Sequence, residues 1–232
     1  YDKDDQLVST LGPGKKKGLN IVEWGYSMQA PKIAKGKTFD FGGFIVPRVP
    51  AGEYKVVIKK GKESFESKID VRYPKNSIYS EEERKIQQEM VGTMYNLTED
   101  LAYLVYKIDF ILESIESYKD DKSISKSASA LKGELNKLKK TLVITSGDNY
   151  VGSADPQLRE QISDLFGVIA GYPGKPGNNH VELFTSLMSD YKMSEKTFNS
   201  VQKKYMTKYI KALEKSGKPA LYWKTRADFV KK

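Results

Sequence analysis

The most regular pattern of hydrophobic positions in this chain extends from Ser80 to Tyr118. Apolar residues recur there every three or four positions, which places them on one face of an α-helix and the charged residues on the other. At a rise of about 1.5 Å per residue, the predicted helix is about 55 Å long. A rod of that length buries its stripe only against other helices, so we expect it to be the spine of a bundle. The stripe consists of Ile86, Met90, Met94, Leu97, Leu101, Leu104, Ile108, Ile111, Ile115 and Tyr118.

The start of this helix has its own signal. Ser80 stands at the N-cap position, and Glu83 follows three residues later, which is the spacing of a capping box. Glu81 and Glu82 complete an acidic first turn, where carboxylates favour the positive end of the helix dipole. The triplet is interpreted as a helix start, with a metal site as the alternative.

Three later stretches carry matching stripes. One runs from Ile124 to Leu142 and a second begins at Pro156, where Ser153 or Asp155 is the expected cap. A third runs from Phe184 to Leu213, with a bend expected near Ser194 that leaves open one helix or two. Because polar loops join these stretches, the pattern predicts an antiparallel bundle of three to four helices over residues 76–232.

The first 75 residues carry a different pattern. Residues 54–60 and 63–71 are two runs rich in strand-forming residues on either side of the tight turn Gly61-Lys62, which predicts an antiparallel hairpin. Shorter runs at 6–11, 19–24 and 44–46 also suggest strands. About five strands in so few residues favour a small β-sandwich, with a linker near Tyr73-Pro74. The fold class is therefore α+β, with domains 1–75 and 76–232.

Composition narrows the function classes. The 232 residues carry a net charge of +9, no cysteine and one histidine. The absence of cysteine excludes disulfides and thiolate metal sites. Lys and Arg exceed Asp and Glu by six in residues 1–75 and by three in the remainder, which favours solvated surface over a nucleic-acid site. No apolar run is long enough for a transmembrane segment. Because the chain begins at Tyr1 rather than methionine, we expect a processed or excised piece.

Residues that often carry chemistry do not form a catalytic pattern. The single His180 stands at the start of a helical stretch without a nucleophile motif, and one histidine alone cannot build a zinc site. Asn96-Leu97-Thr98 matches a glycosylation sequon in the middle of the predicted helix. Gly12-Pro13-Gly14-Lys15 lacks the spacing of a phosphate loop. We predict no catalytic, cofactor-binding or metal residue.

Paired carboxylates and tyrosines leave two alternatives open. The acidic pairs fit solvent-facing or helix-end positions, although a glycosidase also needs two carboxyl groups about 5–10 Å apart. These pairs are Glu99 with Asp100, Glu113 with Glu116, and Asp120 with Asp121. The tyrosines fit an aromatic bundle core, with a carbohydrate-stacking surface as the alternative. They are Tyr95, Tyr103, Tyr106, Tyr191, Tyr205 and Tyr209.

Several sequence motifs resemble those of a known family. Residues 17–24 and 49–58 read KGLNIVEW and VPAGEYKVVI, and residues 69–74, IDVRYP, lead into the long helix. This series is similar to the C-terminal region of bacterial sortilin-like proteins, which carry Asp-box (BNR) repeats in an N-terminal β-propeller and are often described as glycosyl hydrolases. The resemblance implies an antiparallel Ig-like β-sandwich followed by the helical bundle. No Asp-box motif occurs in this chain, so no functional residue is carried over from the family.

The resemblance also implies a function and a location. We expect a non-catalytic interaction or scaffold module of a secreted, cell-surface or periplasmic bacterial protein. Its partner would be its own N-terminal propeller or another envelope protein, contacted on the outer helix faces or at the junction near Tyr73. The alternative is an accessory glycan-binding region of a glycoside hydrolase that uses Trp24, Tyr222 or Trp223. Nucleic-acid binding ranks last.

Overall fold

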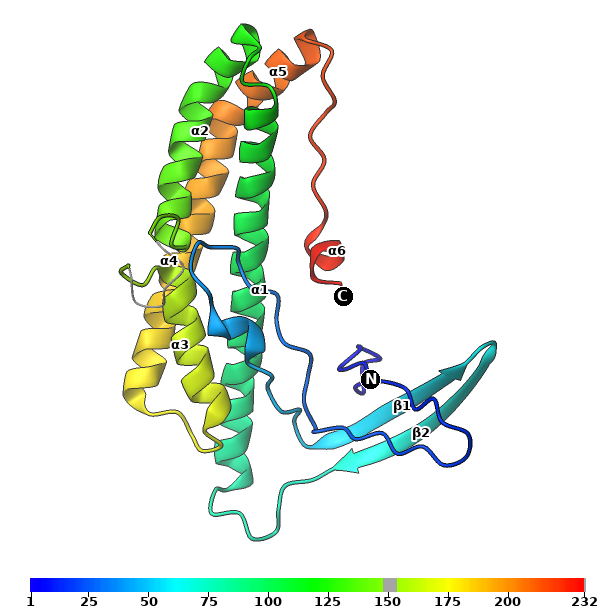
Figure 1. Ribbon diagram of the computed structural model, residues 1–232. Helices are drawn as coiled ribbons and strands as arrows, with labels where there is room; N and C mark the ends of the chain where they lie inside the picture. The colour runs from blue at the N-terminus through cyan, green and yellow to red at the C-terminus, as the bar shows by residue number, and fades with distance from the viewer. Residues whose placement is uncertain (148–153, 232) are drawn as a thin grey trace.

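The computed structural model describes residues 1–147 and 154–231, and it is mostly helical (Figure 1). A short hairpin precedes a set of long helices. The elements in order are η1 (Phe41–Phe44, a 3₁₀ turn), β1 (Gly52–Lys60), β2 (Glu63–Val71), α1 (Glu81–Ser117), α2 (Lys122–Leu142), α3 (Leu158–Gly171), α4 (Asn178–Val201), η2 (Gln202–Met206, a π-helical turn), α5 (Thr207–Lys215) and α6 (Arg226–Val230).

The predicted spine is confirmed as α1, a helix of 37 residues. The Glu83 N–H donates to Ser80 Oγ at 3.2 Å, and the Ser80 N–H donates back to the Glu83 carboxylate at 2.9 Å. This capping box satisfies N–H groups that have no partner within the helix. From Met94 to Ile115 the apolar stripe is almost completely buried.

The other helices cover that stripe. Figure 1 shows α1 running the length of the bundle, α2 and α3 descending beside it in succession, and α4 with α5 ascending again. α1 contacts both α2 and α3, while α4 contacts α2 and α3 and α5 contacts α2. The facing stripes therefore meet in a single core. Its largest fully buried side chains include Met94, Leu101, Ile108, Leu131, Leu135, Phe166, Phe198 and Tyr209.

The predicted start of the third helix is wrong. α3 begins at Leu158, and Gln157 is its N-cap, with the Gln157 N–H donating to the Glu160 carboxylate at 3.2 Å. Asp155 therefore lies before the cap. The alternative cap, Ser153, lies outside the described residues. The predicted end is confirmed, because α3 stops at Gly171.

The bend expected near Ser194 is also wrong. α4 is continuous through that residue, and Ser194 Oγ donates to the Asp190 carbonyl within the helix at 2.8 Å. The departure from α-helical geometry comes later, at η2, after which the chain continues directly into α5. The stretch is thus one long rod with a π-helical turn.

The predicted hairpin is confirmed. β1 and β2 pair antiparallel, with Tyr54 opposite Ile69 and Ile58 opposite Phe65. Gly61 begins the connecting turn with a φ of 61°, a conformation that glycine adopts at little cost. Side chains alternate between the two faces of a strand, so the hairpin is amphipathic. One face carries Tyr54, Val56, Ile58, Phe65 and Ile69, and the other carries Glu53, Lys55, Val57, Glu66 and Lys68.

The predicted β-sandwich, and with it the α+β fold class, is wrong. β1 and β2 form the only sheet in residues 1–147 and 154–231, so no second sheet covers the hairpin. Alternation favours extended backbone at 6–11 and 19–24, but a strand also needs a hydrogen-bonded neighbour. Outside the hairpin, the described segments form one isolated bridge, between Ser27 and Arg48. Leu19 and Ile21 are consequently 88% and 81% exposed.

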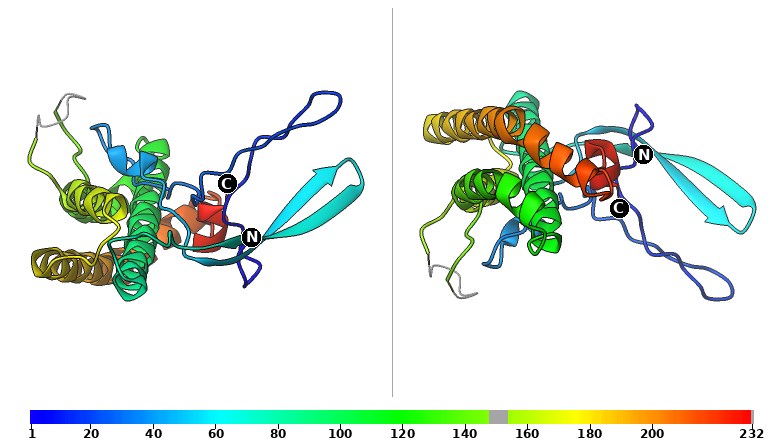
Figure 2. Two further views of the ribbon diagram at one scale, coloured as in Figure 1. Left: turned by 90° about the horizontal axis from the view of Figure 1, so that it is seen from below. Right: turned by 90° about the horizontal axis from the view of Figure 1, so that it is seen from above.

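Two parts of the chain project from the bundle (Figure 2). One is the hairpin, and the other is a looped segment, residues 7–24, which we call the arm. The Gln29 N–H donates to the Val8 carbonyl at 3.0 Å at the base of the arm. Towards its tip, the Asn20 side chain bonds to the Lys16 N–H and carbonyl at 2.9 Å. Hydrogen bonds at these points, rather than a strand ladder, order the arm.

After α5 the chain returns along α1 and forms the short α6. Tyr103 Oη donates to the Lys224 carbonyl at 2.8 Å, and the Phe229 ring stacks on Tyr106 with centroids 4.9 Å apart. Arg226 forms an ion pair with Asp100. The tail therefore covers a half-buried aromatic face of α1.

The division into domains 1–75 and 76–232 stays a prediction. Residues of the predicted first domain do lie on the helices. Ala34 is 2% exposed within the helical core, and the Lys37 N–H donates to the Ile144 carbonyl at 2.7 Å. No helix among the described residues has the length and hydropathy of a membrane span, which agrees with the expected absence of a transmembrane segment.

Candidate protein-interaction surface

The strongest candidate for a binding surface is a group of three phenylalanines before β1. Phe39, Phe41 and Phe44 are 50%, 62% and 69% exposed. The Phe39 ring meets Phe41 edge-on at 5.0 Å between centroids and stacks on Phe44 at 5.5 Å. We call these three residues the aromatic knob. Rings that touch one another while open to water form a cohesive apolar patch, unlike scattered single side chains.

The turn that presents the knob is held close to α3. Asp40 caps η1, and its Oδ1 accepts a hydrogen bond from the Gly42 N–H at 2.9 Å. A Cβ at Gly42 would lie 2.3 Å from Ser163 Oγ. A side chain at position 42 would displace the Ser163 hydroxyl, which donates to Asp40 Oδ2 at 3.1 Å. The backbone of the knob is therefore tied to α3 on its inner side.

A buried arginine fixes the segment that leads into the knob. Arg159 of α3 is 4% exposed. Its Nη1 donates to the Ala34 carbonyl at 3.1 Å, and its Nη2 donates to the Thr38 carbonyl at 3.1 Å and to Thr38 Oγ1 at 2.7 Å. A Cβ at Gly36 would lie 2.5 Å from the guanidinium carbon. The backbone of residues 34–38 thus wraps closely around the guanidinium.

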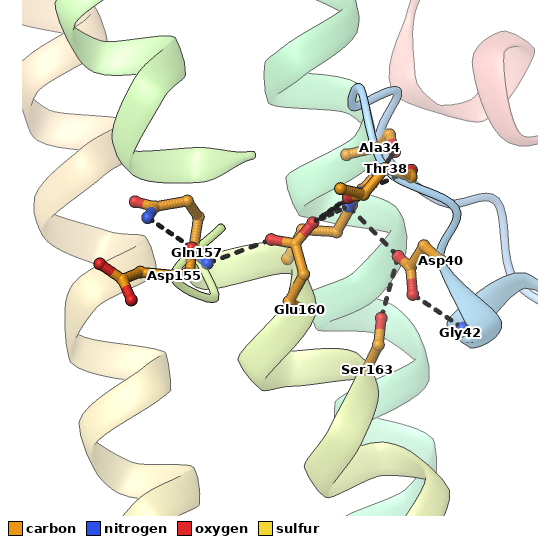
Figure 3. Close-up of polar contacts among 9 residues, drawn as sticks. Ala34, Thr38, Asp40, Gly42, Asp155, Gln157, Glu160 and Ser163 are labelled. Carbon is orange, nitrogen blue, oxygen red and sulfur yellow. Dashed lines mark hydrogen bonds and ion pairs between the residues drawn. The ribbon is translucent and has the colours of Figure 1, made fainter. Parts of the chain in front are cut away.

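Two carboxylates balance the charge of Arg159. Its Nε donates to Glu160 Oε1 at 2.9 Å and lies 3.4 Å from Asp40 Oδ2. Figure 3 shows Thr38, Asp40, Glu160 and Ser163 converging between α3 and the segment before β1. We call these four residues and Arg159 the arginine network. Since a buried charge is costly unless it is paired and hydrogen-bonded, the network strongly favours one arrangement of this segment.

The hairpin and the arm form a second exposed apolar region. Ile58 and Phe65 are 61% and 55% exposed near the hairpin tip. At its base, Tyr54 is buried, and its ring meets Trp24 edge-on with centroids 5.5 Å apart. The apolar face of the hairpin is therefore covered only near the bundle.

The structure places His180 in the first turn of α4, half-buried and beside Gly177. No group of three or more His, Cys, Asp or Glu side chains within residues 1–147 and 154–231 is placed to hold a metal ion. The sequon residues Asn96 and Thr98 lie in the middle of α1, and Thr98 is buried, with its hydroxyl donating to the Met94 carbonyl at 2.9 Å. The residues 12–15 lie in the arm.

One of the acidic residues expected at the surface is buried. Glu99 is 6% exposed, accepts a hydrogen bond from the Lys32 N–H at 3.3 Å and lies 3.8 Å from Arg226. Burial, with help from Glu99, raises the pKa of the neighbouring Tyr95 phenol to about 12. Asp100 is half-buried beside Arg226. Glu99 therefore joins α1 to the segments before β1 and after α5.

The remaining acidic pairs lie where the sequence suggested. Glu113 and Glu116 are exposed on α1, and Asp121 caps α2. Hydrogen bonds from Lys119 and Lys132 lower the pKa of the Glu116 carboxyl to about 2. Glu116 therefore stays ionised over the whole neutral and mildly acidic range.

The tyrosines belong mainly to the core. Tyr209 is fully buried, and its hydroxyl lies 2.8 Å from Ser114 Oγ. Tyr95, Tyr191 and Tyr205 pack half-buried against the core, whereas Tyr103 and Tyr106 lie under the C-terminal tail. The core interpretation is confirmed for these packed rings.

The tryptophans offer little free ring surface. Trp24 packs on Tyr26 and Tyr54, and Trp223 packs edge-on against Phe110 at 6.4 Å between centroids. Tyr222, by contrast, is 84% exposed. Glycan binding stays a prediction, with Tyr222 as the most exposed of its three aromatic residues.

Two cavities lie along α1. The first, about 530 Å³, is open to solvent and lined by α1, α2 and residues 35–37, and its Lys132 and Lys139 already pair with Glu116 and Asp109. The second, about 400 Å³, lies between α1, α4 and Arg226. Burial raises the pKa of the Tyr191 phenol there above its ordinary value of 10.0. His180 lines neither cavity.

Sequence reasoning missed the aromatic knob and the arginine network. A signal for the knob was present, because residues 39–44 contain three phenylalanines, and Phe39 and Phe41 fell in a stretch with no predicted element to bury them. No local signal identified Arg159, since its partners Thr38 and Asp40 lie far away in the sequence and its own position looked like an ordinary helix surface.

Comparison with protein-family models, curated proteins and solved structures found no match to this chain. The resemblance to bacterial sortilin-like proteins therefore stays a prediction.

Proposed function

We propose that this chain is a non-catalytic module that mediates protein–protein contacts through the aromatic knob. The observation that carries the proposal is the combination of 50–69% exposure, mutual ring contact and a buried arginine network beneath. Exposed apolar patches on proteins often mark interaction sites, and aromatic anchors supply much of the energy at interfaces.

Rigidity supports this assignment. An interface must offset the entropy lost when side chains and loops are ordered on binding. The knob lies on a turn whose residues 34–42 are already ordered by hydrogen bonds from α3 to Ala34, Thr38 and Asp40, and by the Gly42–Asp40 hydrogen bond within the turn. Its partner therefore orders little additional backbone. An apolar groove or pocket in a folded protein is the matching surface.

The partner and location follow from the resemblance. The chain would serve as a scaffold module of a secreted or surface-exposed bacterial sortilin-like protein. The aromatic knob would then contact either the propeller of that protein or another protein of the cell envelope. The bundle supplies the stable base from which the contact is made.

The test is retrieval of a partner from envelope extract with three purified proteins. These are the unmodified chain, the double variant Phe41→Asp/Phe44→Asp, and the matched control Val181→Asp/Leu183→Asp. Val181 and Leu183 are 46% and 45% exposed on α4, away from the knob. The control therefore adds the same charges to a different exposed apolar site.

We expect the unmodified chain and the control to retain the same protein, and the knob variant to lose it. Titration with that purified partner should show an affinity about thirtyfold weaker for the knob variant, which corresponds to about 2 kcal/mol. Equal retention by the knob variant would overturn the proposal. So would retention of nothing above an unrelated helical bundle.

A further inference from the structure

The two edges of the hairpin differ in what they offer another chain. The Lys55 N–H donates to the Tyr1 carbonyl at 2.9 Å, and the Tyr1 ammonium donates to the Lys55 carbonyl at 2.8 Å. Lys55 thus directs its backbone groups away from β2. In an antiparallel pair, two residues that stand opposite each other direct their backbone N–H and C=O groups the same way: both towards the partner strand or both away from it. Lys68 is opposite Lys55.

The same alternation applies along all of β2. Its outward N–H and C=O groups are those of Ser64, Glu66, Lys68 and Asp70. Every residue from Glu63 to Asp70 is exposed. Within the part of the chain that the structure describes, no backbone hydrogen bond reaches this edge from outside the hairpin. The β2 edge is therefore open over its whole length, whereas Tyr1 occupies part of the β1 edge.

The sequence of β2 is complementary to itself when it is read in opposite directions. If two copies align with Ser67 opposite Ser67, each Glu66 stands opposite a Lys68 and each Phe65 stands opposite an Ile69. The neighbouring registers that also pair the outward groups are unfavourable. One places Glu66 opposite Glu66, and the other places Lys68 opposite Lys68, and like charges directly opposite destabilise a sheet.

We propose that a second copy of this chain docks on the β2 edge, antiparallel and around a two-fold axis at Ser67. The two hairpins then form one four-stranded sheet. Its new ladder pairs Glu66 with Lys68 and Ser64 with Asp70, each twice. The interface is isologous, because both copies contribute the same β2 edge. That edge is the one left fully open in each copy, so the assembly closes at a dimer.

The side chains agree with this register on both faces. On the charged face, the two Glu66–Lys68 pairs form across the new boundary. On the other face, Phe65 and Ile69 belong to positions without backbone bonds to the second copy, where facing side chains approach most closely. These two residues are 55% and 37% exposed in the single chain. The contact would therefore cover apolar surface that the chain itself leaves open.

The first test uses single cysteines, which the chain otherwise lacks. At the two-fold axis, the two copies of residue 67 have Cα atoms about 4.5 Å apart, which is within the range for a disulfide. Ser67→Cys should therefore form a covalent dimer under mild oxidation. Ser64→Cys is the matched control, because Ser64 stands opposite Asp70 and far from its own copy.

We expect Ser67→Cys to cross-link at least about tenfold faster than Ser64→Cys. Only Ser67→Cys places the two thiols of a dimer within disulfide distance. Equal rates for the two variants would overturn the register and the proposal. Circular dichroism should show the same helix content for both variants, because both serines are exposed on a hairpin outside the bundle.

The second test exchanges charges and needs no cross-link. Glu66→Lys alone and Lys68→Glu alone each place like charges opposite one another in the homodimer. Each should weaken dimerisation about tenfold in sedimentation equilibrium. An equimolar mixture restores opposite charges at both positions, so heterodimers should form with the affinity of the unmodified chain. Single variants that dimerise normally, or a mixture that stays monomeric, would overturn the proposal.

Discussion

The helical bundle and the projecting hairpin use the same kind of amphipathic pattern, with opposite outcomes. In the bundle, Phe166 and Phe198 are completely buried, because α1, α2, α3 and α4 present their stripes to one another. In the hairpin, Phe65 is 55% exposed, because no second sheet faces it. The comparison teaches that a pattern identifies the apolar face of an element, while burial depends on which other elements the chain supplies.

The largest effect that tests this comparison is expected in the bundle core. Phe166→Ala should lower the free energy of unfolding by about 3–5 kcal/mol, because it leaves a cavity among packed side chains. Urea denaturation followed by circular dichroism measures this. A loss below about 1 kcal/mol would contradict the burial of this ring, since such a change is typical of surface sites.

The arginine network should give the next largest effect. Arg159→Met removes the cation between two carboxylates and leaves the buried Asp40 carboxylate without its opposite charge, at a cost of about 3 kcal/mol. Arg72→Met in the projecting region is the matched control, because the ion pair of Arg72 with Asp70 is exposed. Its effect should stay within about 0.5 kcal/mol. Equal losses of unfolding free energy in the two variants would contradict the prediction that a buried ion pair stabilises the protein more than an exposed one.

The cap of α1 should have a smaller effect. Ser80→Ala should cost about 1 kcal/mol in unfolding free energy at neutral pH, because the Glu83 N–H loses its acceptor. Urea denaturation at pH 7, with Ser64→Ala at an exposed serine of β2 as the control, measures it. An effect as small as that of a surface substitution would contradict the capping box.

The same cap predicts a pH dependence. Hydrogen bonds from the Ser80 backbone and then its side chain lower the pKa of the Glu83 carboxyl below its ordinary value of 4.5. The stabilisation is therefore present above that value and is lost as the pH falls through the lower folded-state pKa. Glu83→Gln should reduce stability near neutral pH, and its difference from the unmodified chain should shrink on acidification. A difference that is constant with pH would contradict the assignment.

The smallest effect is expected on the open face of the hairpin. Ile58→Ser should change the free energy of unfolding by less than about 0.5 kcal/mol, because exposed side chains lose little contact. Urea denaturation at dilute concentration, where no second copy interferes, measures it. A large loss would show that another part of the protein covers this face.

Sequence reasoning succeeded where the deciding interactions are local. The helix from Ser80 to Tyr118 followed from its stripe and from the capping box with Glu83, both of which act within a few residues. The turn at Gly61 identified the hairpin for the same reason.

One local signal was present but not used. The spacing Thr225-x-x-Asp228 marks the start of α6, where the Asp228 N–H donates to Thr225 Oγ1 at 3.1 Å. The short tail was not interpreted as a helix.

It failed where distant segments decide the outcome. Ile21 lies in a run, residues 19–24, that suggested a strand, yet no neighbouring strand among the described residues pairs with it. Arg159 is buried because residues 34–40 fold over α3, which no local pattern in either segment indicates. In the sequence, Glu99 resembles a surface carboxylate, but in the structure it is buried beside Lys32 and Arg226. These residues required the three-dimensional arrangement.

The π-helical turn has a consequence for how the length of this sequence can vary. From Phe198 to Leu213, the buried residues of the last long rod are spaced by three or four, except between Val201 and Met206, where the step is five. A π-helical turn accommodates one residue more than an α-helical turn. Related chains that lack one residue between 202 and 205 would form an unbroken α-helix, with Phe198 and Tyr209 still facing the core. In an alignment, a single-residue gap at this position would therefore mark a change of helix type without a change of fold.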